Sequence, residues 1–139
     1  IIINNRSSID GNIESFSNLK NLTTLEIDST CIHGNINIAL SKLYNLKHVS
    51  ISNDNTSTSV TGSSSSSHCI TNDYRGRNSG STCKSSSKIE GTLGAFSALS
   101  KLNYLKIQSI NFICGSITSL SKLKSLKTLI IISNSPVIG

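Results

Sequence analysis

Aliphatic residues recur along the chain in the pattern LxxLxxLxI, and polar residues fill most positions between them. The four copies begin at Leu19, Leu43, Leu99 and Leu123, so 24 residues separate the first two (43 − 19) and the last two (123 − 99). In one copy valine replaces the third leucine. The final LxI of each copy predicts a short strand with one buried face. The three-residue spacing before it predicts a helical or 3₁₀ turn that leads into the strand.

A second mark, Gly-x-Ile/Leu, follows at a similar distance in each unit. It occurs at Gly11, Gly34, Gly91 and Gly115, and glycine allows the backbone to turn sharply. One such unit cannot bury its own apolar stripe, so we expect successive units to stack and to share one core.

The combined unit resembles the plant-type, 24-residue class of leucine-rich repeat. The resemblance covers most of the chain outside one insertion. It implies an α/β solenoid: a leucine-rich repeat with short parallel β-strands on one face, about five turns, uncapped ends and one long polar insertion. The chain lacks an N-terminal signal pattern and an initiator Met, so we expect a processed form or a fragment, or a unit whose ends stack on other copies.

The insertion lies within a single predicted domain, residues 1–139. It is a Ser-rich loop over residues 54–87, interpreted either as an O-glycosylated tract or as a plain linker. N-glycosylation signals occur at Asn5, Asn21 and Asn55. These signals predict a glycoprotein if the protein is secreted by a eukaryote.

The four cysteines, Cys31, Cys69, Cys83 and Cys114, form no CxxC pair. Their even number, together with the glycosylation signals, favours disulfides and an extracellular or cell-surface location. A local Cys69–Cys83 bond is preferred, and Cys31–Cys69 with Cys83–Cys114 is the alternative. A direct Cys31–Cys114 bond is disfavoured because the predicted turns place these residues too far apart.

The formal net charge is +6, from 13 Lys and Arg against 7 Asp and Glu. The basic residues are spread among the leucines without an aromatic-rich basic run, which is typical of a solvated face and predicts no nucleic-acid partner. The longest Leu/Ile run, residues 129–132, is too short to cross a membrane. GxSxG, HExxH and phosphate-loop motifs are absent, so we expect no catalytic residues, metal site or cofactor, and no enzyme.

The outward positions of the predicted strands are the candidate binding surface, because leucine-rich-repeat proteins bind mainly through this face. They combine acidic, aromatic, basic and exposed apolar side chains, the types found at protein interfaces. The candidate residues are Glu26, Asp28, His48, Tyr104, Lys106, Ile130 and Ile132.

Three functional hypotheses follow. The first is an extracellular module for protein recognition or adhesion through the sheet face. The second is a structural glycoprotein subunit of a fibre or coat that self-associates end to end through open solenoid ends. The third is binding to ice or crystal surfaces, which requires regular ranks of Thr or Ser that the sequence does not maintain.

Overall fold

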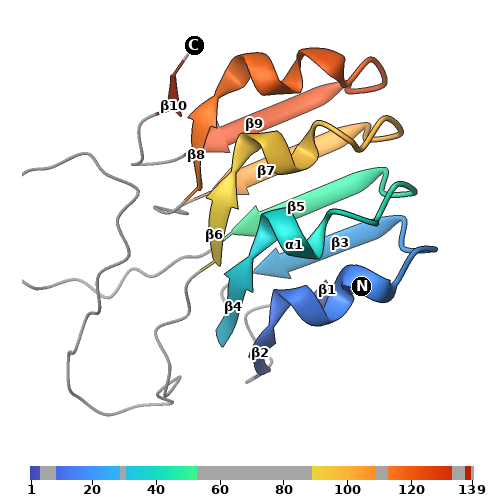
Figure 1. Cartoon of the computed structure of the whole chain (residues 1–139), viewed down its shortest axis with the longest axis vertical. Coiled ribbons are helices and arrows are strands. Elements are labelled where there is room, and N and C mark those ends of the chain that lie inside the picture. Colours follow the sequence, from blue (N-terminus) through green and yellow to red (C-terminus); the bar gives the residue numbers. More distant parts are fainter. Residues whose placement is uncertain (4–8, 29–30, 53–88, 109–112, 133–136, 139) are drawn as a thin grey trace, which may run out of the picture.

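Short parallel strands form two sheets, seen in a computed structural model of the chain (Figure 1). The structure describes residues 1–3, 9–28, 31–52, 89–108, 113–132 and 137–138. The first sheet has the order β1 (Ile2–Ile3), β3 (Thr24–Asp28), β5 (His48–Ser52), β7 (Tyr104–Gln108) and β9 (Thr128–Ile132). The second sheet has the order β10 (Val137–Ile138), β8 (Ile113–Ser116), β6 (Ile89–Thr92), β4 (Cys31–Asn35) and β2 (Asp10–Asn12).

Strands alternate between the two sheets along the chain, and short helices connect the second sheet to the first. The helices are η1 (Ile13–Asn18), α1 (Ile36–Ala39), η2 (Leu93–Phe96) and η3 (Ile117–Lys122). Figure 1 shows each helix at the end of a second-sheet strand, followed by a turn that runs to a first-sheet strand. The turns therefore gather along one edge of the molecule.

The 24-residue spacing explains the pairing in the first sheet. Equivalent positions face each other directly, as Leu25 faces Val49 and Leu105 faces Leu129. In the second sheet the register is staggered by two positions, since Gly34 faces Ile89, which lies two residues before Gly91. In both sheets, backbone N–H and C=O groups thereby find hydrogen-bond partners on the neighbouring strand.

The predicted fold class, an α/β solenoid of leucine-rich-repeat type with strands on one face, is wrong. The structure has two parallel sheets, and the second is built from the segments around the Gly-x-Ile/Leu marks, which we expected to be turns. The reason is that Ile32, Ile89 and Ile113 are buried there, which anchors the segments in an extended conformation beside one another. Three of the glycines, Gly34, Gly91 and Gly115, adopt positive φ near the ends of these strands, so they start the turn only after the strand has paired.

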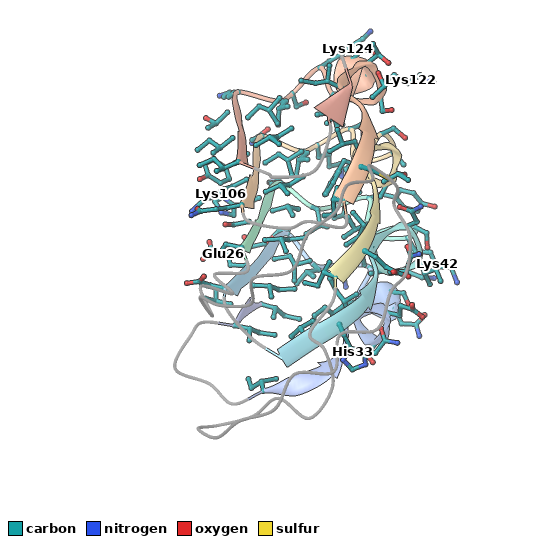
Figure 2. The ribbon with its side chains drawn as sticks, turned by 90° about the vertical axis from the view of Figure 1, so that its left-hand side faces the viewer. Glu26, His33, Lys42, Lys106, Lys122 and Lys124 are labelled. Carbon is teal, nitrogen blue, oxygen red and sulfur yellow. The ribbon has the colours of Figure 1, made fainter. Side chains whose placement is uncertain are left out.

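The hydrophobic core lies between the two layers, and Figure 2 shows side chains filling this space. Leucines of the repeated pattern contribute to it from the turns and the first sheet, and isoleucines contribute to it from both sheets and from the helices. Phe96 of η2 is completely buried and is the largest of the fully buried side chains. Other fully buried residues include Ile13, Leu25, Ile36, Leu40, Leu43, Leu46, Val49, Ile51, Leu93, Leu99, Leu102 and Leu105.

The predicted Ser-rich loop at 54–87 falls within residues 53–88 and so lies outside the described residues. The structure also leaves the single-domain prediction for residues 1–139 untested.

Candidate functional site

The candidate site is the exposed face of the first sheet, which consists of three rows of side chains that cross the strands. In-register pairing aligns equivalent residues of β3, β5, β7 and β9. The first row is Thr24, His48, Tyr104 and Thr128; the second is Glu26, Ser50, Lys106 and Ile130; the third is Asp28, Ser52, Gln108 and Ile132. All seven predicted binding residues therefore belong to one surface.

Three of these residues, Glu26, His48 and Tyr104, contact one another in series. The Nε2 atom of His48 lies 3.1 Å from Oε1 of Glu26, and both side chains are about one-third exposed, at 34% and 37%. The imidazole stacks on the phenol ring of Tyr104 with centroids 4.3 Å apart and planes only 1° from parallel. Cross-strand pairs of this kind fix side-chain orientation on a sheet. The result is an ordered patch with a carboxylate at one end and a phenol at the other.

Asp28 and Ser52 form a second ordered contact on the same face. The Ser52 hydroxyl donates to Oδ1 of Asp28 over 2.5 Å, and Ser52 is buried although it lies on the outer row. This hydrogen bond restrains the carboxylate of Asp28. The acidic groups of the site, Glu26 and Asp28, are thus both held by neighbours on β5.

The opposite end of the face is basic and apolar. Lys106 lies next to Ile130, and Ile132 at the end of β9 is 56% exposed. Figure 2 shows Glu26 and Lys106 on the same side of the molecule, away from the second sheet. The surface therefore changes from acidic to aromatic to apolar across the strands.

The other predicted residues lie elsewhere. Asn21 is exposed in the turn before β3, where a glycan would have access to solvent, whereas Asn5 and Asn55 lie outside the described residues. Cys31 begins β4, and Cys69 and Cys83 are outside the described residues. Of these residues the structure describes Asn21 and Cys31, and neither lies on the exposed face of the first sheet.

Cys114 in β8 is disulfide-bonded. Strand β6 lies between β8 and β4, so the Cα atoms of Cys114 and Cys31 are separated by at least two strand spacings of ~4.8 Å. This exceeds the reach of a disulfide, ~7 Å between Cα atoms. The geometry therefore excludes the bond between Cys31 and Cys114, and the pairing expectations that involve Cys69 and Cys83 stay predictions.

An open groove of about 730 Å³ lies at the side of the molecule where β1 begins. Ile1, Leu19 and Leu22 supply its apolar lining, and Asn18, Lys20 and Asn21 its polar lining. Within the described ranges, no three His, Cys, Asp or Glu side chains are grouped closely enough to hold a metal ion. Among the helices that the structure describes, none is long and apolar enough to cross a membrane.

Ile2 of β1 lies beside Glu26 and extends the second row, and Ile3 lies opposite Ile27. Sequence reasoning missed one feature of this region, the contact between Asp28 and Ser52. The 24-residue offset between these two positions was the available signal, because it places them opposite each other on adjacent strands.

No protein-family model matches the chain, and comparisons with curated proteins and with solved structures give no match either. The resemblance to leucine-rich repeats thus stays a prediction from the sequence.

Proposed function

We propose that this chain is a non-enzymatic recognition module that binds a protein segment through the exposed face of its first sheet. The observation that carries the proposal is the ordered series Glu26–His48–Tyr104, which lies on the same face as the exposed Ile132 and the half-buried Ile130 of β9. Tyrosine is enriched among the residues that dominate binding energy, and prior ordering lowers the entropy lost on association.

The open position of the site supports a binding role over catalysis. His48 is partly exposed and its Nε2 already contacts a carboxylate on a sheet face. Catalytic histidines generally act in sites that exclude water and position a substrate. A broad face with fixed side chains instead favours contact with a partner surface.

An extracellular or cell-surface location is part of the proposal. The disulfide of Cys114 supports it, because structural disulfides persist mainly in oxidising compartments. N-linked glycosylation at the exposed Asn21 is compatible with the same location.

The test is selection of a random-peptide phage library on the immobilised chain, followed by affinity measurement with two matched variants. Tyr104→Ala removes the stacked ring, whereas Tyr44→Ala removes another tyrosine, 55% exposed, from a turn outside the sheet. We expect selected peptides to lose about tenfold or more in affinity for Tyr104→Ala, as for a hot-spot residue. They should bind Tyr44→Ala as they bind the unmodified chain. Failure to enrich any peptide, or equal losses in both variants, would refute the proposal.

A second candidate function is self-association, and it is favoured by the exposed edge of β9. Leu129 is 39% exposed, although Leu105, its register partner on the neighbouring strand β7, is completely buried. In the described part of the chain, β9 pairs on one side only. A strand from a second copy would cover Leu129 and continue the sheet, giving the open-ended assembly expected of a head-to-tail contact.

Sedimentation velocity tests this second function on the 139-residue chain. We expect a concentration-dependent shift to larger species that Leu129→Lys abolishes. Ile38→Lys, at a residue that is 51% exposed on α1, serves as the control and should leave the shift intact. A monomer at all concentrations up to hundreds of micromolar would exclude end-to-end assembly.

A further inference from the structure

Seven exposed lysines gather at the edge formed by the turns before the first-sheet strands. The turns cover residues 17–23, 40–47, 97–103 and 121–127, and none of them contains Asp or Glu. We call this surface the basic edge; its lysines are Lys20, Lys42, Lys47, Lys101, Lys122, Lys124 and Lys127, all exposed. In the sequence these lysines are scattered among leucines, but the fold stacks the four turns beside one another (Figure 1).

Backbone hydrogen bonds hold these turns in a ladder. The Lys47 N–H donates to Thr23 O over 2.8 Å, the Asn103 N–H to Lys47 O over 2.7 Å, and the Lys127 N–H to Asn103 O over 2.8 Å. Lys47 and Lys127 therefore occupy equivalent positions in turns that are two strand spacings apart, a distance of ~10 Å at the usual spacing. The basic edge is a strip of regularly repeated positions on a fixed backbone.

Side-chain contacts tie the same turns together without neutralising the lysines. The Asn45 amide donates to Lys20 O over 2.9 Å, and Lys101 Nζ donates to Asn45 Oδ1 over 2.7 Å. In the described ranges, no carboxylate lies within ion-pair distance of these seven ammonium groups. Figure 2 shows Lys42, Lys122 and Lys124 on the helix side of the molecule, opposite Glu26. Positive charge is thus concentrated along this edge, with no paired carboxylate among the residues that the structure describes.

We propose that the basic edge binds a linear anionic polysaccharide, one that carries sulfate or carboxylate groups along its length. Lysine ammonium groups on long flexible stems suit such anions as point charges. The strip runs over four stacked turns, ~14 Å from first to last at ~4.8 Å per strand spacing, and so matches a chain-like ligand better than a single small anion. The anion groups along the polymer would replace the missing carboxylates.

The composition of the edge favours a polysaccharide over a nucleic acid. Proteins that bind single-stranded nucleic acid stack bases on several aromatic rings along a basic groove. The four turns contain one aromatic residue, Tyr44, and no arginine, the residue best suited to bidentate base contacts. Charge attraction without stacking or base readout is sufficient for a sulfated sugar chain.

The experiment measures binding of fluorescein-labelled heparin by anisotropy, at several salt concentrations. The edge variant combines Lys47→Gln, Lys122→Gln, Lys124→Gln and Lys127→Gln. The control variant changes four other basic residues to Gln: Arg75, Arg77, Lys84 and Lys88, which lie outside the described residues. Both variants reduce the formal charge equally, from +6 by four to +2.

We expect the edge variant to lose about tenfold or more in affinity at 0.1 M salt, with a weaker dependence of affinity on salt, because fewer ions are displaced. The control variant should stay within about threefold of the unmodified chain. A third variant with Arg at the four edge positions should restore binding, which separates loss of charge from loss of folding. Far-UV circular dichroism and thermal unfolding check that all variants fold.

Three results would overturn the proposal. Equal losses in the edge and control variants would show a response to net charge only. Tighter binding to a single-stranded oligonucleotide than to heparin of equal charge would assign the edge to nucleic acid. No binding of the unmodified chain to heparin at 0.1 M salt would exclude the site altogether.

Discussion

Substitution of Gly91 tests whether strand β6 of the second sheet packs against helix α1 as described. Gly91 in β6 has a φ of +144°, a conformation that side chains with a Cβ rarely adopt. A Cβ added there would collide with Cγ1 of Ile36, which is buried in α1, and would lie 2.9 Å from Asn37 Oδ1. Gly91→Ala therefore introduces both backbone strain and a steric clash.

Gly115 and Gly11 separate these two effects. Gly115 has a φ of +117°, but an added Cβ would meet its nearest neighbour, Leu93 N, at 3.5 Å, an ordinary contact. Gly11 has no neighbour within 4 Å, and its φ is not positive. Alanine at Gly115 thus adds strain only, and alanine at Gly11 adds neither term.

The free energy of unfolding should decrease in the same order. Positive φ costs a residue with a Cβ ~1–2 kcal/mol, and alanine regains ~0.4–1 kcal/mol by restricting the unfolded chain. We therefore expect a loss of ~1 kcal/mol for Gly115→Ala and a gain of ~0.4–1 kcal/mol for Gly11→Ala. Overpacking adds ~1–3 kcal/mol at Gly91, for a total of ~2–4 kcal/mol.

Urea unfolding followed by circular dichroism measures these differences, and calorimetry should show a Tm lower by ~4 °C per kcal/mol for a chain of this size. If Gly91→Ala is no less stable than Gly115→Ala, α1 does not pack against β6 as described. A double variant, Gly91→Ala with Ile36→Ala, removes the Cγ1 atom that the added Cβ would strike, so its loss of stability should be smaller than the sum of the two single losses. A fully additive loss would also count against the described packing.

Three further changes test other parts of the structure. Phe96→Ala empties the centre of the core and should cost ~3–5 kcal/mol in urea unfolding, whereas a loss below 1 kcal/mol would contradict its complete burial. Asn35→Ala removes the helix-capping side chain whose Oδ1 accepts a hydrogen bond from the Asn37 N–H over 2.8 Å, and it should lower the free energy of unfolding by ~1 kcal/mol. Asn35→Ser should be nearly as stable as the unmodified chain. Equal stability of both variants and the unmodified chain would contradict a stabilising role of this cap. Peptide mapping without reduction should find Cys114 linked to a cysteine other than Cys31, and a Cys31–Cys114 peptide would contradict the strand order.

The sequence predicted the first sheet well because its signal is local. Leu25 and Ile27 alternate with Glu26 within a few residues, so the buried and exposed faces could be assigned without tertiary information. The 24-residue offset then fixed the register with β5. All seven candidate binding residues lie on the face that these two signals define.

The second sheet was missed because its strands carry little periodicity of their own. A segment such as Cys31–Asn35 (CIHGN) contains a single buried isoleucine and a glycine, which locally favours a turn. Its extended conformation comes from pairing with β2 and β6, which are remote in the sequence. Local propensity cannot show a strand that is stabilised mainly by its neighbours.

The basic edge, like the second sheet, could not be predicted from the sequence. Lys47 and Lys127 are separated by 80 positions (127 − 47), so in the sequence each seems an isolated solvent-exposed charge. The backbone bonds that join their turns through Asn103 place them on one strip. Repetition thus places lysines that are distant in the sequence on one strip, whose four turns contain no Asp or Glu. The exposed face of the first sheet, in contrast, carries Glu26 and Asp28 together with Lys106. The proposed polysaccharide and the proposed protein segment would therefore bind two different surfaces of one chain, of which only the basic edge has a single sign of charge.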